Sequence, residues 1–289
     1  MAAASIVSEN QDQIGWVTIS SCSLPFVTRI VNDERLQFVS VRMAENNLLQ
    51  RYISQLHINV MKFSPAKSLY MNNFEAKYFN KMNQIHRDKL YKENTPFKTT
   101  DCIVRVEDVK EFHIFIEFCH TKLFNDVIPN TYDKCGFICV SDEFDMSVIP
   151  YIVKDNIKYT PLFFFETESD LTPLCKKMEG WCIAYLKFCF KVMDINYELF
   201  LSIDSYMMIS ISNIKRYFQR FTRFHKLWPP NFDRWDLIDH TRTNRSGSWV
   251  KIPLQIPATE NIHEQQANQM DSSIMAQGSN VDHDLESSP

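Results

Sequence analysis

Residues 101–166 constrain the fold most, because strand-like and helix-like patterns follow one another there in close succession. Residues 101–106 and 134–140 are short apolar runs with β-branched side chains, which are typical of strands. Between them, residues 109–124 repeat apolar side chains at helical spacing. Two further apolar runs complete the pattern, at 146–153 and 157–165. The order predicts a compact βαββαβ unit that occupies residues 99–166.

The chain before this unit has a similar but shorter pattern. Residues 14–63 contain a strand-like run at 15–19, a hairpin across 32–34, a helical apolar face at 44–57 and a closing strand at 58–63. This β-β-α-β order matches the second half of the unit predicted downstream. We interpret residues 14–63 as a partial copy of that unit.

Residues 64–98 form a predicted linker in which basic residues outnumber acidic ones. Four aromatic residues lie among the basic ones: Tyr70, Phe74, Tyr78 and Phe79. Basic and aromatic side chains together are typical of segments that follow a nucleic-acid backbone and stack on bases. The same composition also fits a solvated helical linker whose aromatic residues pack onto a neighbouring domain, and both interpretations stay open.

Residues 167–257 predict a C-terminal α+β region with one strongly amphipathic helix. Residues 181–192 are almost continuously apolar and are buried as a helix or as a strand, while residues 198–203 form a strand. Residues 211–228 place their apolar side chains on one side of a predicted helix. The opposite side is basic and carries Lys215, Arg216, Arg220, Arg223 and Lys226.

The two ends of the chain differ from the rest in composition. Residues 1–13 are small and polar, and residues 258–289 contain acidic residues but no Lys or Arg. We predict that both ends are disordered, because they have little apolar surface to bury. The acidic end offsets the basic segments, so the formal net charge of −4 conceals them.

Composition argues against several classes of protein. With 5 Gly and 22 Phe among 289 residues, the chain has no glycine-rich loop of the kind that cradles phosphates. No apolar run approaches the roughly 20 residues that a membrane span requires. The first residues carry no secretory signal, so the eight Cys are expected to be reduced, in cytosol or nucleus. Their spacing fits core packing, and we expect no catalytic residue, metal, cofactor or small-molecule substrate.

These patterns predict an α+β fold class, with two small β-sheet units, packed amphipathic helices and a disordered C-terminal tail. In order and spacing, the unit at 99–166 resembles an RNA-recognition motif (RRM), whose RNP1 and RNP2 strands carry base-stacking aromatic residues. Residues 136–140 align with the core of RNP1. The resemblance implies RNA contacts by Phe137 and the nearby Lys134, by Phe200 in an RNP2-like run, and by Phe38 in the partial unit. Arg216, Arg220 and Arg223 are expected to add contacts to phosphates.

Two RRM-like units without an arginine–serine tract, in a chain of this length, resemble the Transformer-type splicing regulators of insects. The resemblance implies a regulator of sex-specific pre-mRNA splicing that associates with RNA and with protein partners and is not an enzyme. It also implies a nuclear location, with the cytoplasm as the alternative.

A second family offers another interpretation. The order of apolar runs between residues 104 and 192 also looks like an extended Tudor domain, in which an aromatic cage holds methylated Arg or Lys. Phe163, Phe164 and Phe165 are the residues that this resemblance places in such a cage. The third interpretation is an α+β scaffold that binds protein partners and has no small ligand of its own.

Overall fold

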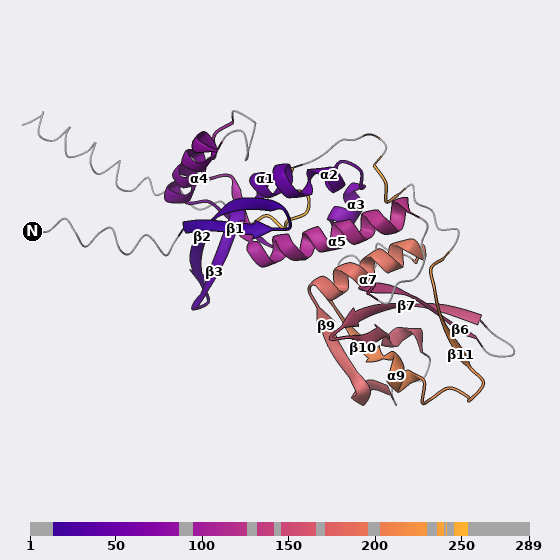
Figure 1. The fold of residues 1–289 in the computed structure, drawn as a ribbon. Coiled ribbons are helices and arrows are strands. Elements are labelled where there is room, and N and C mark those ends of the chain that lie inside the picture. The colour runs from indigo at the N-terminus through magenta and orange to yellow at the C-terminus, as the bar shows by residue number, and fades with distance from the viewer. Residues whose placement is uncertain are drawn as a thin grey trace, which may run out of the picture. The chain divides into compact units, whose positions relative to one another are not determined.

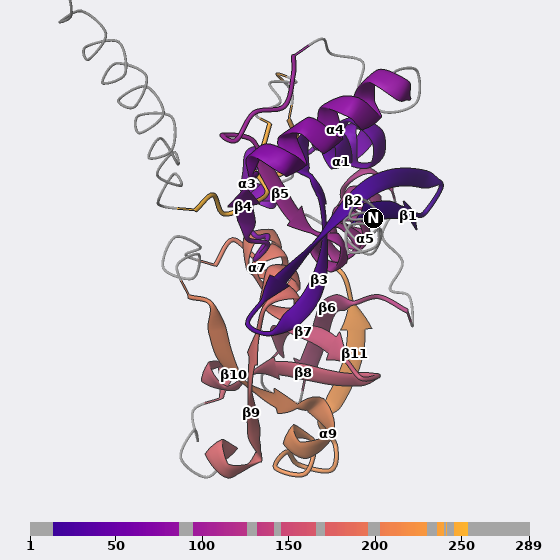
Figure 2. The same cartoon turned by 90° about the vertical axis from the view of Figure 1, so that its left-hand side faces the viewer.

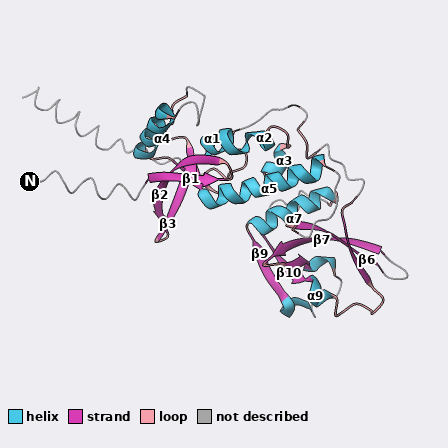
Figure 3. Ribbon diagram, in the orientation of Figure 1, coloured by secondary structure: helices cyan, strands magenta, loops and turns pink. Residues whose placement is uncertain are grey.

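A computed structural model of the chain describes residues 14–86, 95–125, 132–141, 146–165, 171–195, 203–229, 236–239, 241 and 246–253. These residues form helices and two antiparallel β-sheets (Figure 1, Figure 3). The predicted α+β class is therefore confirmed. Residues 198–202 of the strand predicted at 198–203, which include Phe200, lie outside the described residues, and Ile203 is not in a strand. The ends predicted to be disordered, 1–13 and 258–289, also lie outside the described residues.

The first sheet has five strands in the order β1-β2-β3-β5-β4, and every neighbouring pair is antiparallel. Its strands are β1 (Ile14–Ile19), β2 (Cys22–Val31), β3 (Glu34–Ser40), β4 (Ser68–Tyr70) and β5 (Cys102–Arg105). Strands β2 and β3 meet at Asn32 and Asp33, whose φ angles of 51° and 63° suit a two-residue hairpin loop. The hairpin predicted at this position is confirmed.

Helical segments follow β3 and flank the two short strands. They are α1 (Val41–Ala44), the π-helical η2 (Glu45–Leu49), α2 (Gln50–Ile53), α3 (Ile58–Met61), α4 (Asn73–Ile85) and α5 (Val106–Phe124). The closing strand predicted at 58–63 is wrong, because α3 begins there. His57 caps this turn, its Nδ1 accepting a hydrogen bond from the backbone N–H of Asn59 at 3.3 Å, and β4 takes the place beside β5 instead.

The segment predicted as a linker at 64–98 contains β4 and α4 and is part of the fold. Asn72 and Glu75 form a capping box at the start of α4. Arg29 of β2 donates to both carboxylate oxygens of Glu75, at 2.6 Å and 2.5 Å, and so fastens α4 to β2. Tyr78 and Phe79 are buried, so these aromatic rings pack onto the neighbouring sheet instead of stacking on bases.

The second sheet has six strands in the order β11-β6-β7-β8-β10-β9, again antiparallel throughout. Its strands are β6 (Cys135–Ser141), β7 (Met146–Lys154), β8 (Ile157–Pro161), β9 (Cys175–Glu179), β10 (Ser205–Ser210) and β11 (Arg223–Leu227). Its helices are η3 (Leu162–Phe164), η4 (Thr172–Leu174), α7 (Trp181–Val192) and α9 (Ile211–Ile214). The apolar run at 181–192 is thus a buried helix, whereas an extended Tudor arrangement would need a strand there.

The βαββαβ unit predicted at 99–166 is divided between the two sheets. β5 lies in the first sheet, whereas β6, β7 and β8 lie in the second, with α5 connecting them. The reason is hydrogen bonding: β5 has β3 on one side and β4 on the other, so neither edge is left for β6. The partial unit at 14–63 likewise shares its sheet with β4 and β5.

The amphipathic helix predicted at 211–228 is wrong beyond its first turn. Ser210 caps α9, accepting a hydrogen bond from the N–H of Asn213 at 3.2 Å, but the helix ends at Ile214. The chain then turns and pairs as β11 with β6, from Arg223 opposite Ser141 to Leu227 opposite Phe137. Pairing along β6 outweighs the local helical pattern, because it gives the edge of that strand backbone partners.

Helices α5 and α7 pack between the two sheets. They lie side by side in Figure 1, and Phe115 of α5 meets Tyr185 of α7 edge-to-face at 5.1 Å between ring centroids. One continuous hydrophobic cluster runs from Val104 in the first sheet through both helices to Phe137 in the second. The two sheets therefore share a core, and neither half is a separate domain.

Residues 246–251, which we call the C-terminal strap, return to the first sheet. The backbone N–H of Lys251 donates to the carbonyl of Ala66 at 2.8 Å, and the N–H of Ser68 donates to the carbonyl of Lys251 at 3.0 Å. Trp249 is 1% exposed and stacks on Phe112 of α5, with ring centroids 4.6 Å apart. The strap thus closes the core over α5.

Candidate nucleic-acid interface

The aromatic residues of the two RNP1-like strands are buried. Phe38 is 2% exposed and Phe137 is fully buried, its ring meeting Trp228 edge-to-face at 5.1 Å. Both belong to the core that contains α5 and α7, whereas base stacking needs a ring that solvent can reach. Their expected role in stacking therefore does not fit this fold. Lys134 is exposed just before β6.

Strand β11 forms one edge of the second sheet (Figure 2), and basic residues gather there. Arg216, Arg220 and Arg223 are exposed there, on the turn after α9 and at the start of β11. We call this region the basic surface; its cationic residues are Lys158, Lys215, Arg216, Arg220, Arg223 and Lys226. None of the three arginines forms an ion pair with another described residue, and residues 205–229 contain no Asp or Glu.

Aromatic side chains lie between these cations and divide into two groups. Phe218 and Phe224 are half-buried and meet edge-to-face at 5.5 Å, which anchors the turn to the sheet. Tyr217 and Phe221 remain 56% and 52% exposed. Proteins that bind a single strand of nucleic acid use this combination, with cations on the phosphates and exposed rings against the bases.

Lys158 joins the basic surface from strand β8. Its Nζ lies 4.5 Å from the centroid of the Tyr151 ring, which in turn lies over Gly136, where a side chain would collide with the phenol. Burial, and then the neighbouring Lys226 and Lys215, lower the pKa of Lys158 to about 8. The ammonium group of Lys158 thus lies close enough to those of Lys226 and Lys215 to be repelled by them, an arrangement that an anion would stabilise.

The rings proposed for a methyl-lysine cage stack on each other. Phe163 and Phe164 are nearly parallel, 29° apart, with centroids at 4.7 Å, and Phe165 packs edge-to-face on Phe218. A cage needs rings that face a common space wide enough for a methylated cation. The observed arrangement leaves no such space between Phe163 and Phe164.

The remaining chemical groups fit a structural role. All eight cysteines are free thiols, and burial raises the pKa of Cys119 and Cys135 well above the ordinary value. Among the described residues, no three His, Cys, Asp or Glu side chains are grouped so as to hold a metal ion. None of the described helices is both long enough and apolar enough to cross a membrane.

Sequence reasoning found the arginines of the basic surface but missed the rest of it. Lys158 is far from the arginines in the sequence, and the pairing of β8 with β7, of β7 with β6 and of β6 with β11 brings it close to Lys226 and Lys215. Tyr217 and Phe221 were assigned to the buried side of a helix. No local pattern marks them as exposed, because their exposure follows from the turn that replaces the helix.

Comparison of the chain with protein-family models, with curated proteins and with solved structures finds no match. Its function must therefore be inferred from the geometry described above and from the sequence patterns.

Proposed function

We propose that the protein is an RNA-associated regulatory protein that binds single-stranded RNA on the basic surface and catalyses no reaction. From the sequence resemblance to Transformer-type regulators, we further propose that it acts on sex-specific pre-mRNA splicing, in the nucleus. The RNA contacts are made by Arg216, Arg220 and Arg223, with Tyr217 and Phe221 as stacking rings.

One observation carries this proposal: exposed cations and exposed aromatic rings alternate along residues 215–226, and no acidic residue lies among them. A solvated protein surface ordinarily mixes both signs of charge. A large exposed ring loses favourable burial unless a partner covers it. RNA supplies both the phosphates and the flat apolar faces that such a segment lacks in the free protein.

The basic surface favours a single strand over a duplex. The rings of Tyr217 and Phe221 can contact only bases that are unstacked, and a duplex keeps its bases stacked and its deep groove closed to side chains. The motif residues buried in the sheets play no part in this mode of binding. We therefore expect affinity with little sequence preference, set by charge and stacking.

Binding is tested by titrating a fluorescent single-stranded RNA with the protein and following anisotropy at several salt concentrations. In the variant R216Q/R220Q/R223Q, affinity should fall for every RNA sequence alike. The slope of log K against log salt should become shallower by about 2, since each phosphate contact of a single strand contributes roughly 0.7. The matched control K77Q/K110Q/K176Q removes three exposed charges elsewhere and should bind as the wild type does.

Equal binding by the arginine variant and the wild type would contradict the proposal. If the wild type itself shows no salt-dependent RNA binding, the scaffold alternative replaces it, with an acidic protein surface as the partner. The role in splicing is tested separately, by sequencing transcripts from cells that express the wild type or the arginine variant. Exon usage should change only with the wild type.

A further inference from the structure

A cleft of about 540 Å³ lies away from the basic surface, between the two halves of the chain. One wall comes from the connection of α3 to β4 and from Arg105 at the end of β5. The other comes from the end of β9 and the first turns of α7, and Lys251 of the C-terminal strap closes one side. Its volume is that of a site for one small molecule.

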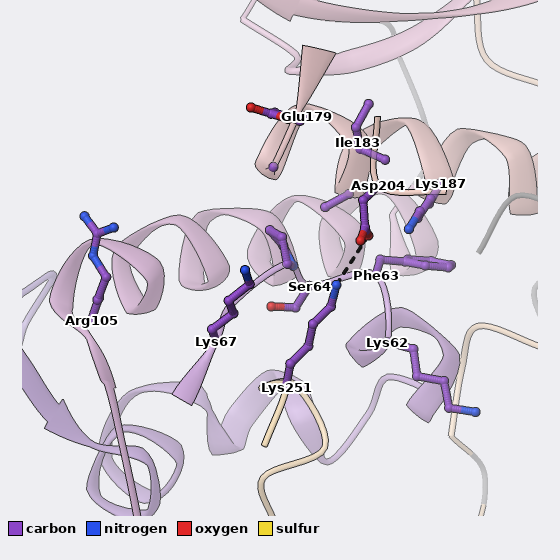
Figure 4. A pocket seen from close by; sticks show the side chains of 13 residues that line it. Lys62, Phe63, Ser64, Lys67, Arg105, Glu179, Ile183, Lys187, Asp204 and Lys251 are labelled. Atoms are coloured by element: carbon purple, nitrogen blue, oxygen red, sulfur yellow. Dashed lines mark hydrogen bonds and ion pairs between the residues drawn. The ribbon is translucent and has the colours of Figure 1, made fainter. Parts of the chain in front are cut away.

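Cations dominate the lining of this cleft. Lys62, Lys67, Arg105, Lys187 and Lys251 contribute positive charge, against Glu179 and Asp204. Figure 4 shows Lys67, Lys187 and Lys251 directing their ammonium groups toward one space, whereas Lys62 points away from it. Lys251 is paired with Asp204 at 3.3 Å, which leaves positive charge in excess.

One of these lysines is held away from solvent. Lys187 is 6% exposed, although its neighbours on the cleft wall include another cation, Lys251. Burial lowers the pKa of Lys187, and the nearby Asp204 opposes this effect only in part. Lys187 and Lys251 thus bring two ammonium groups to the lining of the cleft, where the charge of a bound anion would be favourable.

Two helices begin at the cleft without a capping side chain. Gly180 is the N-cap residue of α7 and Arg105 that of α5, and neither helix has a side-chain cap. The first-turn N–H groups of a helix attract anions through hydrogen bonding and the helix dipole. The first turn of α5 already carries Glu107 and Asp108, and the partly exposed Arg105 forms an ion pair with Glu107 at 3.9 Å, whereas the first turn of α7 has no acidic residue.

Among the described residues that line the cleft, none offers a ring on which a base could stack. Phe63 is the one aromatic residue in its lining, and it is 2% exposed. A ligand would therefore be recognised by its charge and its phosphate oxygens rather than by a base.

We propose that this cleft binds a small polyphosphorylated anion, held by its clustered phosphate groups between Lys67, Lys187, Lys251, Arg105 and the start of α7. The site is separate from the basic surface and does not depend on the function proposed for that surface. Nucleoside polyphosphates and inositol polyphosphates share this chemistry, and they differ in whether a base is attached.

The test is isothermal titration calorimetry of the full chain with inorganic tripolyphosphate, ATP and inositol hexakisphosphate. We expect tripolyphosphate and ATP to bind with similar affinity, since the base has no partner in the cleft. The variant K67Q/K251Q should bind tripolyphosphate roughly tenfold more weakly, because it loses two charge-assisted contacts. Both side chains lie at the surface, so thermal melting should confirm an unchanged fold.

Two further variants keep the result interpretable. D204N removes the exposed carboxylate that competes with the ligand for Lys251, and it should bind tripolyphosphate several-fold more tightly. The variant R216Q/R220Q/R223Q should bind tripolyphosphate normally while losing RNA, which separates the two sites.

The inference is overturned if the wild type does not bind tripolyphosphate, or if K67Q/K251Q binds it unchanged. It is also overturned if the arginine variant alone loses tripolyphosphate, which would place the anion on the basic surface. Binding of ATP without binding of tripolyphosphate would show that a base is recognised. Loss of RNA but not of tripolyphosphate in K67Q/K251Q would assign the cleft to RNA.

Discussion

The indole Nε1 of Trp249 donates a hydrogen bond of 2.9 Å to the buried carboxylate of Glu45. The N–H of Gly247 and the hydroxyl of Ser246 donate to the same carboxylate, at 2.6 Å and 2.5 Å. Glu45 begins the π-helical turn η2, so a single side chain near the start of the fold binds three donors of the C-terminal strap. Burial raises the pKa of Glu45, and these hydrogen bonds lower it in part.

Replacement of Glu45 by Ala should destabilise the fold by about 3 kcal/mol, because it leaves the buried donors of Trp249 and Gly247 without an acceptor. Urea denaturation followed by tryptophan fluorescence measures this difference. The control is E111A, which removes an exposed carboxylate from α5 and should change stability by less than about 0.5 kcal/mol. Equal stability of the two variants would contradict the role assigned to Glu45.

The raised pKa of Glu45 also predicts a pH dependence. The folded state binds this proton more tightly than the unfolded state does, so the contribution is complete below the ordinary glutamate pKa. It is lost as the pH rises through the folded-state pKa. In urea titrations between pH 4 and pH 7, the stability of the wild type minus that of E45Q should therefore decrease with pH. An increase over this range would show that the carboxylate is stabilised as an anion.

The lowered pKa of Lys158 predicts that the protein takes up protons when it binds RNA. This pKa is lowered to about 8, so at pH 8 about half of the molecules carry the uncharged amine. A bound polyanion raises this pKa and draws up to about half a proton per complex from the buffer. Calorimetry in two buffers with different ionisation enthalpies measures the uptake. It should disappear in K158M and at pH 6, and uptake that persists in K158M would have to come from another group.

The exposure of Phe221 predicts that replacing it weakens RNA binding without greatly reducing the stability of the fold. The ring is 52% exposed, so F221A should reduce stability by less than about 1 kcal/mol. The same change should weaken RNA binding by about 1–3 kcal/mol, through loss of a stacked base. The contrasting variant F188A removes a fully buried ring and should cost about 3–5 kcal/mol of stability. A large loss of stability in F221A would restore the helix predicted from sequence.

Local patterns predicted the elements whose structure depends on near neighbours. The helix expected at 109–124 exists as α5, because Phe112, Phe115 and Ile116 repeat at helical spacing and all three are fully buried. The hairpin at Asn32 and Asp33 depends only on backbone geometry within the turn. The burial of residues 181–192 followed from their nearly continuous apolar character.

Elements fixed by distant partners could not be predicted in this way. β5 pairs with β3 and β4, which are far from it in the sequence, and no local pattern indicates this pairing. Residues 223–227 continue the helical pattern that begins at residue 211, and their pairing with the edge of β6 is what makes them a strand. The same distinction applies to the basic surface, where Arg216, Arg220 and Arg223 were predicted from their charge and Lys158 required the fold.

The C-terminal strap has a consequence for synthesis of the protein. Ser68 of β4 donates a hydrogen bond to the backbone carbonyl of Lys251, and Glu45 accepts hydrogen bonds from residues 246–249. The first sheet therefore lacks part of its packing until almost the whole fold has been made. Contacts between residues so distant in the chain slow folding, since a long loop must close first. The nascent N-terminal half therefore leaves the ribosome with an uncovered apolar face on α5, around Phe112. Transiently exposed apolar surface of this kind favours aggregation, so the strap protects the protein only once its synthesis is nearly complete.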